Sequence, residues 1–502
     1  MKQYSFPVLL ALLTLSPSMD GNAAEVTVRG GLSTGLDLYD RRYTAAPEEL
    51  EATGVTVDDD EDDYQRILIR PLIAIDGSTE RSSLGFTYQP SFYYDYLNEE
   101  DGVNHAASLS FRNRVSEAWT LSVIDSVLQS DIAEDVAIAE TSTAPQESGA
   151  TATPATTGQS EGDRISDEEG RRKYTTNTLQ FLSDYAYGQD SLFSMGYAYG
   201  ILRNDDANDD EYQDFDRHQA SLSVGHRLNR EWKATLGGQY VRGLYDEPDN
   251  DTAATAAELQ AAELPEEPSD DLEEYYADAG VEYDGIARHP LRLDYGLAVY
   301  NYDDETRGDS EIHDLTFGWR WNRSPRVTYN LGAGPSYATT DGQDDTWGYN
   351  GEIGADYSIE RGKFHLGLEK ALERRNFTGE VDDNGLIDYW DGRADFSYQL
   401  LQSTSVALFA GYRYEDQDEV IRGGGSLPPS TDAAQLLEND LIETVTTERF
   451  YTGVSVKYSF WQWYALDLSY RYSDQTSDDP GDEYDEHQIM LTLSYAKDFW
   501  RW

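Results

Sequence analysis

The chain has 502 residues and carries 38 Lys and Arg against 95 Asp and Glu, a formal net charge of −57. A charge of this sign and size repels the phosphate backbone of nucleic acids, which excludes them as partners. The chain contains no Cys, which excludes disulfides, thiolate metal sites and c-type haem.

The first 24 residues have the pattern of a cleaved secretory signal. An apolar run from Phe6 to Leu15 follows Lys2 and leads to the small residues Ala23 and Ala24. No later stretch has the roughly 20 consecutive apolar residues that a membrane helix requires. We therefore predict a signal peptide over 1–24 and a single mature domain over 25–502.

From residue 25 onward, short segments alternate apolar and polar side chains, and two classes of connection separate them. Short turns are predicted at Gly77–Glu80, Val115–Ala118, Gly188–Asp190, Asn229–Glu231, Gly285–His289, Arg323–Pro325, Glu360–Gly362, Gln402–Thr404 and Trp461–Trp463. Between them lie longer, mostly acidic connections, of which Arg41–Asp63, Ala133–Lys173, Glu247–Asp271 and Gln417–Glu443 are the longest. This arrangement predicts about 20 antiparallel strands, with a range of roughly 18 to 22.

Several of the long connections have a composition of their own. Residues 133–173 lack periodicity and large apolar side chains, so we predict a long mobile loop there. Residues 253–264 and 432–442 carry Ala, Leu and Glu at helical spacing, which favours short helices, either folded into the pore or lying on the outer rim. The acidic runs Asp58–Asp63 and Asp205–Glu211 suit weak, exchangeable binding of Ca²⁺ or Mg²⁺. They lack the spacing of a dedicated calcium loop, so no metal site is assigned.

The alternation is clearest near the end of the chain. From Thr452 to Phe460 the even positions are Thr, Val, Val, Tyr and Phe, whereas the odd ones are Gly, Ser, Lys and Ser. The same period of two recurs over Tyr464–Tyr472 and Ile489–Ala496. Each strand therefore has one apolar and one polar face, which is typical of a transmembrane β-barrel. We predict an all-β, up-and-down antiparallel barrel in the outer membrane of a Gram-negative bacterium, with short periplasmic turns and long acidic extracellular loops.

Several tyrosine-rich segments resemble a known family. They are Leu468–Asp474, Tyr484–Tyr495, Arg172–Phe181, Tyr197–Gly200 and Asp214–Ser223. These segments resemble the outer membrane β-barrel porins whose genes lie beside bacterial exopolysaccharide and capsule genes. The resemblance implies an outer membrane channel, with exported polysaccharide as a cargo. The chain departs from such barrels at its C-terminus, where Phe499–Trp502 continues past a single closing aromatic residue.

If the apolar faces point to lipid, the opposite faces line a lumen that is rich in cations. The predicted pore-lining residues are Arg66, Arg70, Arg112, Arg114, Lys233, Arg292, Arg320, Arg326, Arg393, Arg413, Lys457 and Arg471. Cations in a narrow pore favour anions, which predicts passage of acidic glycans or other anionic solutes. The alternative interpretation is that these cations pair with carboxylates, as Arg292 with Asp294 and Arg393 with Asp395.

Aromatic side chains at strand ends predict the membrane boundaries. We place Tyr93, Trp319, Tyr464 and Trp502 at the membrane interface.

The His residues follow a related pattern. His105, His218, His313 and His487 each open a strand after an acidic loop and therefore share one rim. Because they are spread around a circumference, they do not converge on one ion, and we interpret them as exposed rim residues. His365 is placed inside the barrel beside Glu369 as a lumen-lining residue.

These observations favour a passive or gated channel with no catalytic residue, cofactor or metal. Neither a G-x-S-x-G nor an H-E-x-x-H signature is present, so a lipid-modifying enzyme is the weakest alternative. The other alternative is a scaffold or sheath for a secreted or periplasmic partner. The predicted partners are outer membrane lipid and lipopolysaccharide, together with periplasmic export machinery or a secreted polymer.

Overall fold

The computed structural model describes residues 25–43, 63–130, 173–204, 214–245, 271–303, 307–343, 345–377, 384–420, 442–478 and 483–502. Every regular element within these residues is a β-strand, and they contain no helix long and apolar enough to span a membrane. The strands are β1 Glu25–Tyr43, β2 Tyr64–Ser78, β3 Ser82–Asp95, β4 Glu100–Arg114, β5 Trp119–Ser130, β6 Tyr174–Gly188, β7 Ser191–Asn204, β8 Phe215–Arg227, β9 Trp232–Tyr245, β10 Leu272–Tyr283, β11 Leu291–Tyr302, β12 Ser310–Ser324, β13 Val327–Thr340, β14 Thr346–Ile359, β15 Gly362–Glu373, β16 Asn384–Leu401, β17 Thr404–Val420, β18 Ile442–Phe460, β19 Tyr464–Ser477 and β20 Tyr484–Arg501.

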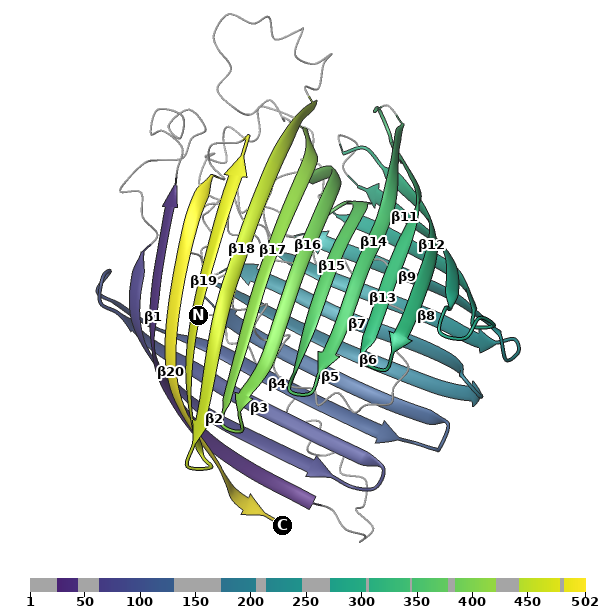
Figure 1. The fold of residues 1–502 in the computed structure, drawn as a ribbon. Coiled ribbons are helices and arrows are strands. Elements are labelled where there is room, and N and C mark those ends of the chain that lie inside the picture. The colour runs from purple at the N-terminus through teal and green to yellow at the C-terminus, as the bar shows by residue number, and fades with distance from the viewer. Residues whose placement is uncertain are drawn as a thin grey trace, which may run out of the picture.

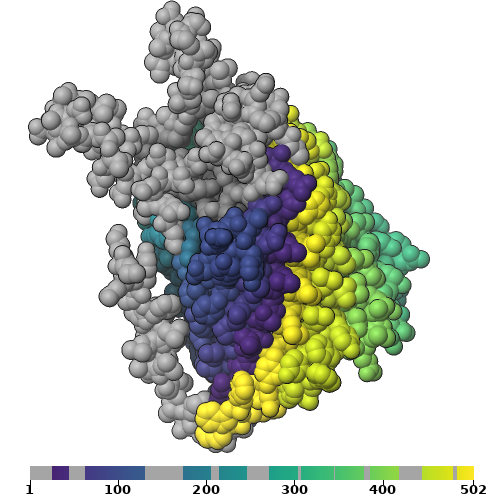
Figure 2. Space-filling view, turned by 90° about the vertical axis from the view of Figure 1, so that its left-hand side faces the viewer, coloured from purple at the N-terminus to yellow at the C-terminus, as the bar shows by residue number. Residues whose placement is uncertain are grey.

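The strands form one closed antiparallel barrel of 20 strands, which confirms the predicted fold class. Each strand pairs with its neighbours in sequence, and β1 pairs with β20 from Thr27–Arg501 to Tyr43–Tyr484. Figure 2 shows β1 as a narrow strip between β2 and the yellow C-terminal strands. Because the ring is closed, no strand is left with an unpaired edge.

The two ends of the barrel differ in the length of their connections, as predicted. At the lower end of Figure 1 the hairpins are short, and the C-terminus lies at this end. The turn between β18 and β19 is an example, with Trp461 and Gln462 at positive φ angles of 48° and 61°. Two successive residues with positive φ match the twist of a tight hairpin. All internal gaps in the described residues fall at the opposite, long-loop end. The predicted signal peptide, almost all of the mobile loop, and the proposed helices up to residue 441 lie outside the described residues.

The strand period places apolar side chains on the outer surface. In β19, for example, Leu466, Leu468 and Tyr470 are 37%, 47% and 37% exposed, and they alternate with the polar residues Asp467 and Arg471. Exposed Leu, Ile, Phe and Tyr side chains recur in the same phase around the ring. A barrel whose apolar side chains face outward and whose charged side chains face inward has the polarity expected in a lipid bilayer.

Aromatic rings gather at the short-turn end of this outer surface. Trp319 stacks on His289 and Trp321, with ring centroids 5.8 and 6.2 Å away. Tyr464 packs between Phe460 and Tyr495 at 5.6 and 5.1 Å. Aromatic bands of this kind mark the water boundary of membrane barrels.

A bulge near the C-terminus accounts for the extra aromatic residues there. Trp500 pairs with Val28 and Asp498 pairs with Arg29, which leaves Phe499 without a partner in the ladder. The ring of Phe499 lies over Gly30, so a side chain at this glycine would require the ring to move. The chain then continues to Trp502, whose backbone exchanges two hydrogen bonds of 2.9 Å with Val26. The closing strand β20 therefore continues past the single closing aromatic residue that is usual in such barrels.

Candidate functional site

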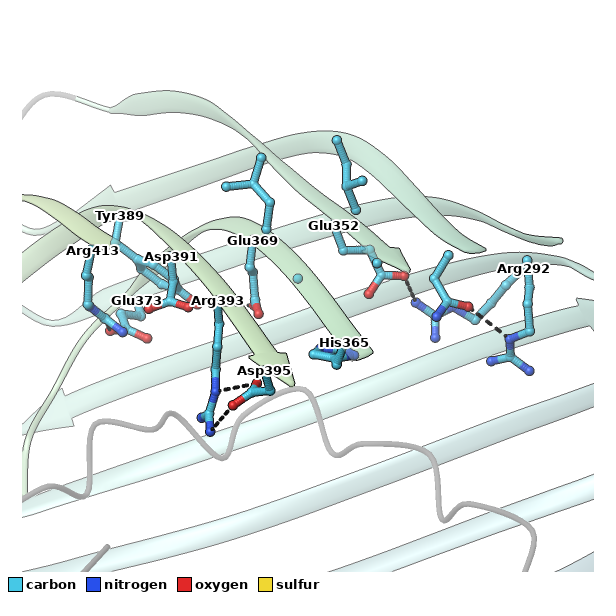
Figure 3. A pocket seen from close by; sticks show the side chains of 16 residues that line it. Arg292, Glu352, His365, Glu369, Glu373, Tyr389, Asp391, Arg393, Asp395 and Arg413 are labelled. Carbon is cyan, nitrogen blue, oxygen red and sulfur yellow. Dashed lines mark hydrogen bonds and ion pairs between the residues drawn. The ribbon is translucent and has the colours of Figure 1, made fainter. Parts of the chain in front are cut away.

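The barrel encloses a polar cavity of about 580 Å³ against the inner wall of β11–β17. Figure 3 shows its charged side chains projecting from adjacent strands into one space. The lining is Arg292, Arg320, Asn330, Glu352, Ile353, Gly354, His365, Gly367, Leu368, Glu369, Glu373, Tyr389, Asp391, Arg393, Asp395 and Arg413. Four of the predicted pore-lining arginines thus share one cavity.

These arginines are engaged with carboxylate and amide groups. Arg292 lies 2.5 Å from Asp294 and 3.0 Å from Glu352. Arg320 donates from Nε to an Asn330 oxygen at 3.2 Å. Arg393 and Asp395 point toward each other and form two hydrogen bonds of 2.8 and 3.2 Å (Figure 3). The ion pairs Arg292–Asp294 and Arg393–Asp395 are those foreseen in the alternative interpretation of the sequence.

A network of ion pairs lies at the end of β15. Arg413 donates to Glu373 at 2.8 Å and also to Glu415. Arg375 contacts the same two carboxylates, with Glu373 at 2.9 Å. Burial lowers the pKa of the Arg375 guanidinium, but Glu415 and Glu373 raise it by more, so this pKa lies above its ordinary value. The network therefore holds two permanent cations between two carboxylates.

The cavity as a whole is close to electrically balanced. Its lining contains four arginines and five carboxylates. Some of these carboxylates lie on the same strand as an arginine, as Asp391 and Asp395 beside Arg393, and others on a different strand, as Glu373 of β15 beside Arg413 of β17. The wall therefore offers alternating hydrogen-bond donors and acceptors rather than a uniform positive field.

Buried apolar side chains fill the interior beside the cavity. This interior apolar cluster consists of Tyr174, Leu202, Phe215, Val241, Leu272, Tyr300, Tyr302, Ile312, Ala338, Leu372, Phe377 and Leu386. Most of its members stand near the long-loop ends of their strands, from β6 to β16. Burying such groups away from water is favourable, so the cluster stabilises a closed interior at this end of the barrel.

The segment Leu372–Phe377, here called the inward segment, supplies two members of this cluster. The pairing of β15 with β14 ends at Lys370, whereas its pairing with β16 continues to Glu373. The chain therefore separates from β14 before it separates from β16. Its next residues contact the inner faces of β8–β11, which are not neighbours of β15 in the sheet.

Polar groups hold the inward segment against β9–β11. The Asn376 carbonyl accepts a hydrogen bond from the Tyr245 hydroxyl. The Asn376 side chain accepts one from Tyr302 at 2.7 Å and donates one to Glu274 at 2.8 Å. The buried Arg374 guanidinium donates to the Tyr302 hydroxyl at 2.9 Å. These bonds satisfy polar groups that would otherwise be costly to bury.

Phe377 completes the attachment of the inward segment. Its side chain is 4% exposed and packs against Phe215 and Tyr245, with ring centroids 5.3 and 6.1 Å away. The Arg217 guanidinium covers the ring at 4.5 Å. Gly243 leaves room for the ring, because a Cβ at this position would lie 2.8 Å from it. Sequence reasoning missed this segment because Arg374–Phe377 has neither strand nor helix periodicity.

The other predicted pore-lining residues are distributed around the wall. Arg66 is buried against Asp95 at 3.7 Å, and Arg70 donates to Ser91 at 3.1 Å. The remaining strand residues of this set are Arg112 and Arg114 on β4, Lys233 on β9, Lys457 on β18 and Arg471 on β19. None of these seven residues lines the cavity, so the structure does not bring the twelve cations together.

Two predicted positions need correction. Arg326 lies in the exposed short turn between β12 and β13, because β12 continues to Ser324 and β13 begins at Val327, one residue later than expected. Tyr93 faces inward, where the Arg66 guanidinium lies 4.4 Å above its ring, whereas its neighbours Phe92 and Tyr94 are exposed on the outer face. In a run of three aromatic residues, side-chain type alone does not identify the outward one.

The remaining predicted interface aromatics lie at the short-turn end. Trp319 and Tyr464 belong to the aromatic groups described above, and Trp502 is 80% exposed. Their contact with lipid stays a prediction.

The rim histidines are more ordered than the sequence indicates. In each case the Nδ1 atom lies within hydrogen-bond distance of a Tyr hydroxyl on the preceding strand. The pairs are Tyr88–His105 at 3.0 Å, Tyr197–His218 at 2.9 Å, Tyr295–His313 at 2.9 Å and Tyr470–His487 at 3.0 Å. The four histidines therefore sit on four separate strand pairs.

His365 also has a different partner from the one expected. It lines the cavity, but its Nδ1 lies 2.8 Å from Asp356 on β14. Glu369 instead accepts a hydrogen bond from Tyr389 at 3.2 Å.

The described residues contain no cluster of three or more His, Asp or Glu side chains suited to a metal ion. Apart from Asp63, the two acidic runs predicted to bind divalent cations weakly lie outside the described residues. Their metal binding stays a prediction.

Comparison with known proteins supports the architecture. No family model matches the chain. The FrpB iron transporter of Neisseria meningitidis (F5-1 variant, apoprotein form) is 9% identical with a TM-score of 0.50, over 94% of this chain and 81% of that chain. The siderophore receptor PirA of Pseudomonas aeruginosa is 9% identical with a TM-score of 0.46, over 93% and 80%. OccK2 (OpdF) of the same organism is 12% identical with a TM-score of 0.39, over 94% and 97%. At these identities the similarity to FrpB concerns the fold alone, and the two structures with TM-scores below 0.5 add nothing to it.

Proposed function

We propose that this protein is an outer membrane channel for polar solutes in a Gram-negative bacterium. The observation that carries the proposal is the inverted polarity of the barrel, whose exposed apolar side chains cover the outside while a charged cavity of about 580 Å³ lies inside. Such polarity suits a wall that separates lipid from a water-filled path. On this proposal, outer membrane lipid and lipopolysaccharide contact the outer surface.

For the solute, we propose an acidic sugar chain or another anionic, hydroxyl-rich molecule. Sugars are bound through several hydrogen bonds at once, and the cavity wall supplies donors from Arg393 and acceptors from Asp391 and Asp395 within the same space. The four arginines supply sites that carboxylate groups of a solute would share with the protein's own carboxylates. Exported polysaccharide, received from periplasmic machinery, fits this description.

The alternative function is a closed scaffold or sheath for a secreted or periplasmic partner. The interior apolar cluster favours it, because buried apolar groups replace water in part of the interior. An enzymatic function has no comparable support, since FrpB, the protein of similar fold with a TM-score of 0.50, is described as an iron transporter.

Single-channel recording in a planar lipid bilayer tests the channel proposal. Folded protein, identified by its heat-dependent migration on a gel, is expected to give discrete conductance steps. The reversal potential in a salt gradient is expected to show only weak ion selectivity, because positive and negative side chains are balanced in the cavity. Absence of steps from folded, inserted protein would overturn the channel proposal and favour the scaffold.

A further inference from the structure

We propose that Arg413 binds the carboxylate of an acidic sugar in the cavity, and that this binding releases the inward segment Leu372–Phe377 from the barrel wall. The inference rests on the proposed channel function and specifies its solute and its gate. Three features of the described residues support it.

The first feature is the position of Glu373. This residue is the last of β15, it lines the cavity, and it belongs to the inward segment. It accepts a hydrogen bond from Arg413 of β17 at 2.8 Å. A solute that breaks the contact between Glu373 and Arg413 in the cavity would therefore also loosen the inward segment.

The second feature is the geometry of Arg413. Its guanidinium lines the cavity and lies 4.4 Å from the centroid of the Tyr389 ring. It divides its donors between two carboxylates, using Nη2 for Glu373 and Nε for Glu415. A planar guanidinium binds one carboxylate most strongly when two of its donors face both oxygens. A solute carboxylate in this geometry would replace both protein carboxylates, whereas a neutral hydroxyl lacks the charge to compete.

The third feature is the set of contacts that hold the inward segment beyond Glu373. Arg374, Asn376 and Phe377 are held by side chains of β8–β11, and Phe377 occupies a socket in the interior apolar cluster. On this proposal, release of the segment breaks these contacts. A ligand changes such an equilibrium by the difference between its affinities for the two states. A solute that binds Arg413 only after Glu373 has left therefore favours the released segment.

Cysteine labelling tests release of the segment independently of ionic current. The natural chain has no Cys, so the variant Val241→Cys places a single thiol within the interior apolar cluster, where Val241 is fully buried. Galacturonate is expected to increase the rate of maleimide labelling by about tenfold, a typical size for coupling between two sites. Galactose, which carries a hydroxymethyl group in place of the carboxylate, is expected to leave the rate unchanged.

A second substitution in the Val241→Cys background tests whether the carboxylate of Glu373 holds the segment. Glu373→Gln is expected to label rapidly without galacturonate, because the neutral amide holds Arg413 weakly. Glu448→Gln is the matched control, since this carboxylate lies on an exposed side chain and accepts a hydrogen bond from Tyr412 at 2.8 Å. It is expected to behave as the Val241→Cys parent.

A third pair of variants keeps the inference testable if the thiol variant does not fold. Phe377→Ala in the natural background is expected to increase the open time of the channel without galacturonate. Phe364→Ala, which truncates an exposed Phe at the other end of β15, is expected to leave it unchanged.

The outcomes separate the inference from the function on which it rests. Conductance steps with a labelling rate that ignores galacturonate would overturn the inference and leave the channel intact. Galacturonate-dependent labelling without conductance steps would support binding at Arg413 and overturn the channel. Equal responses to galacturonate and galactose would overturn the assignment of a carboxylate.

Discussion

At the scale of single residues, Arg66 carries its charge in a buried environment. Its side chain is 1% exposed and lies 3.7 Å from Asp95, which is fully buried. The rings of Tyr64 and Tyr93 lie 4.2 and 4.4 Å from the guanidinium. A charge that is removed from water in this way depends on its partner, because bulk solvent no longer compensates it.

Asp95→Asn is therefore expected to destabilise the barrel strongly. The change preserves the shape of the side chain but removes the charge opposite Arg66, which should lower the free energy of unfolding by about 3–5 kcal/mol. Urea titration in detergent micelles, followed by the gel shift of the folded form, measures this change.

Asp498→Asn is the control for that measurement. Asp498 pairs with Arg29 at 3.0 Å, but these side chains are 41% and 44% exposed. Solvent screens such a pair, so its loss should cost at most about 1 kcal/mol. Equal losses in the two variants would contradict the role given to burial.

At the scale of elements, the pairing of β12 with β13 contains a local interruption. Asp314 pairs with Ser336 and Phe317 pairs with Ala333, but no pairs are formed between them. At the interruption the Leu315 carbonyl approaches Gly334 so closely that a Cβ would not fit. The adjoining Pro335 has no N–H to give to the ladder. Only glycine at position 334 permits the two backbones to approach each other this closely.

Gly334→Ala is accordingly expected to lower the temperature at which the folded gel band disappears. Relief of the clash requires backbone movement, and overpacking of this kind typically costs about 1–3 kcal/mol. Gly351→Ala on β14 is the matched control, because the nearest atom to its added Cβ would lie at 3.5 Å, an ordinary contact. A thermal shift of equal size in both variants would show that the close approach at Gly334 is unimportant.

At the scale of the whole molecule, the chain is strongly acidic, but the charges that line the cavity are nearly balanced. The net charge is −57, yet the cavity wall has four arginines beside five carboxylates. The field along the path therefore depends on the protonation of carboxylates, since arginine stays charged at all accessible pH values.

Ion selectivity is thus expected to change with pH. Acidification neutralises carboxylates, whereas arginines keep their charge. The reversal potential should shift toward that of chloride as the pH falls. Arg393→Gln should reduce the shift, whereas Arg29→Gln at the exposed pair near the barrel end should not. A shift toward potassium on acidification would contradict this account of the cavity.

Sequence periodicity was sufficient to predict the architecture. Alternation over Thr452–Phe460 and Tyr464–Tyr472 corresponds to the outer and inner faces of β18 and β19, and the expected turn at Trp461–Trp463 is present. The period of two and the contrast between short and long connections are local properties, so a single sequence contains them.

The site was only partly predictable, because its contacts join residues that are distant in sequence. Arg413 was expected to line the lumen and does line the cavity, but nothing near it in sequence identifies Glu373 as its partner. The inward course of Arg374–Phe377 depends on a socket built from β8 and β9, including the space left by Gly243. Such complementarity is a property of the assembled ring.

Pairing of β1 with β20 has a consequence for the biosynthesis of the protein. The side chains of Glu25 and Arg501, which meet at this seam, are separated by 476 positions. Until β20 joins β1, the sheet has two open edges, and each edge is a template for pairing with another polypeptide. Contacts of such long sequence separation also form slowly. The incomplete barrel is consequently prone to aggregation until the seam between β1 and β20 has closed.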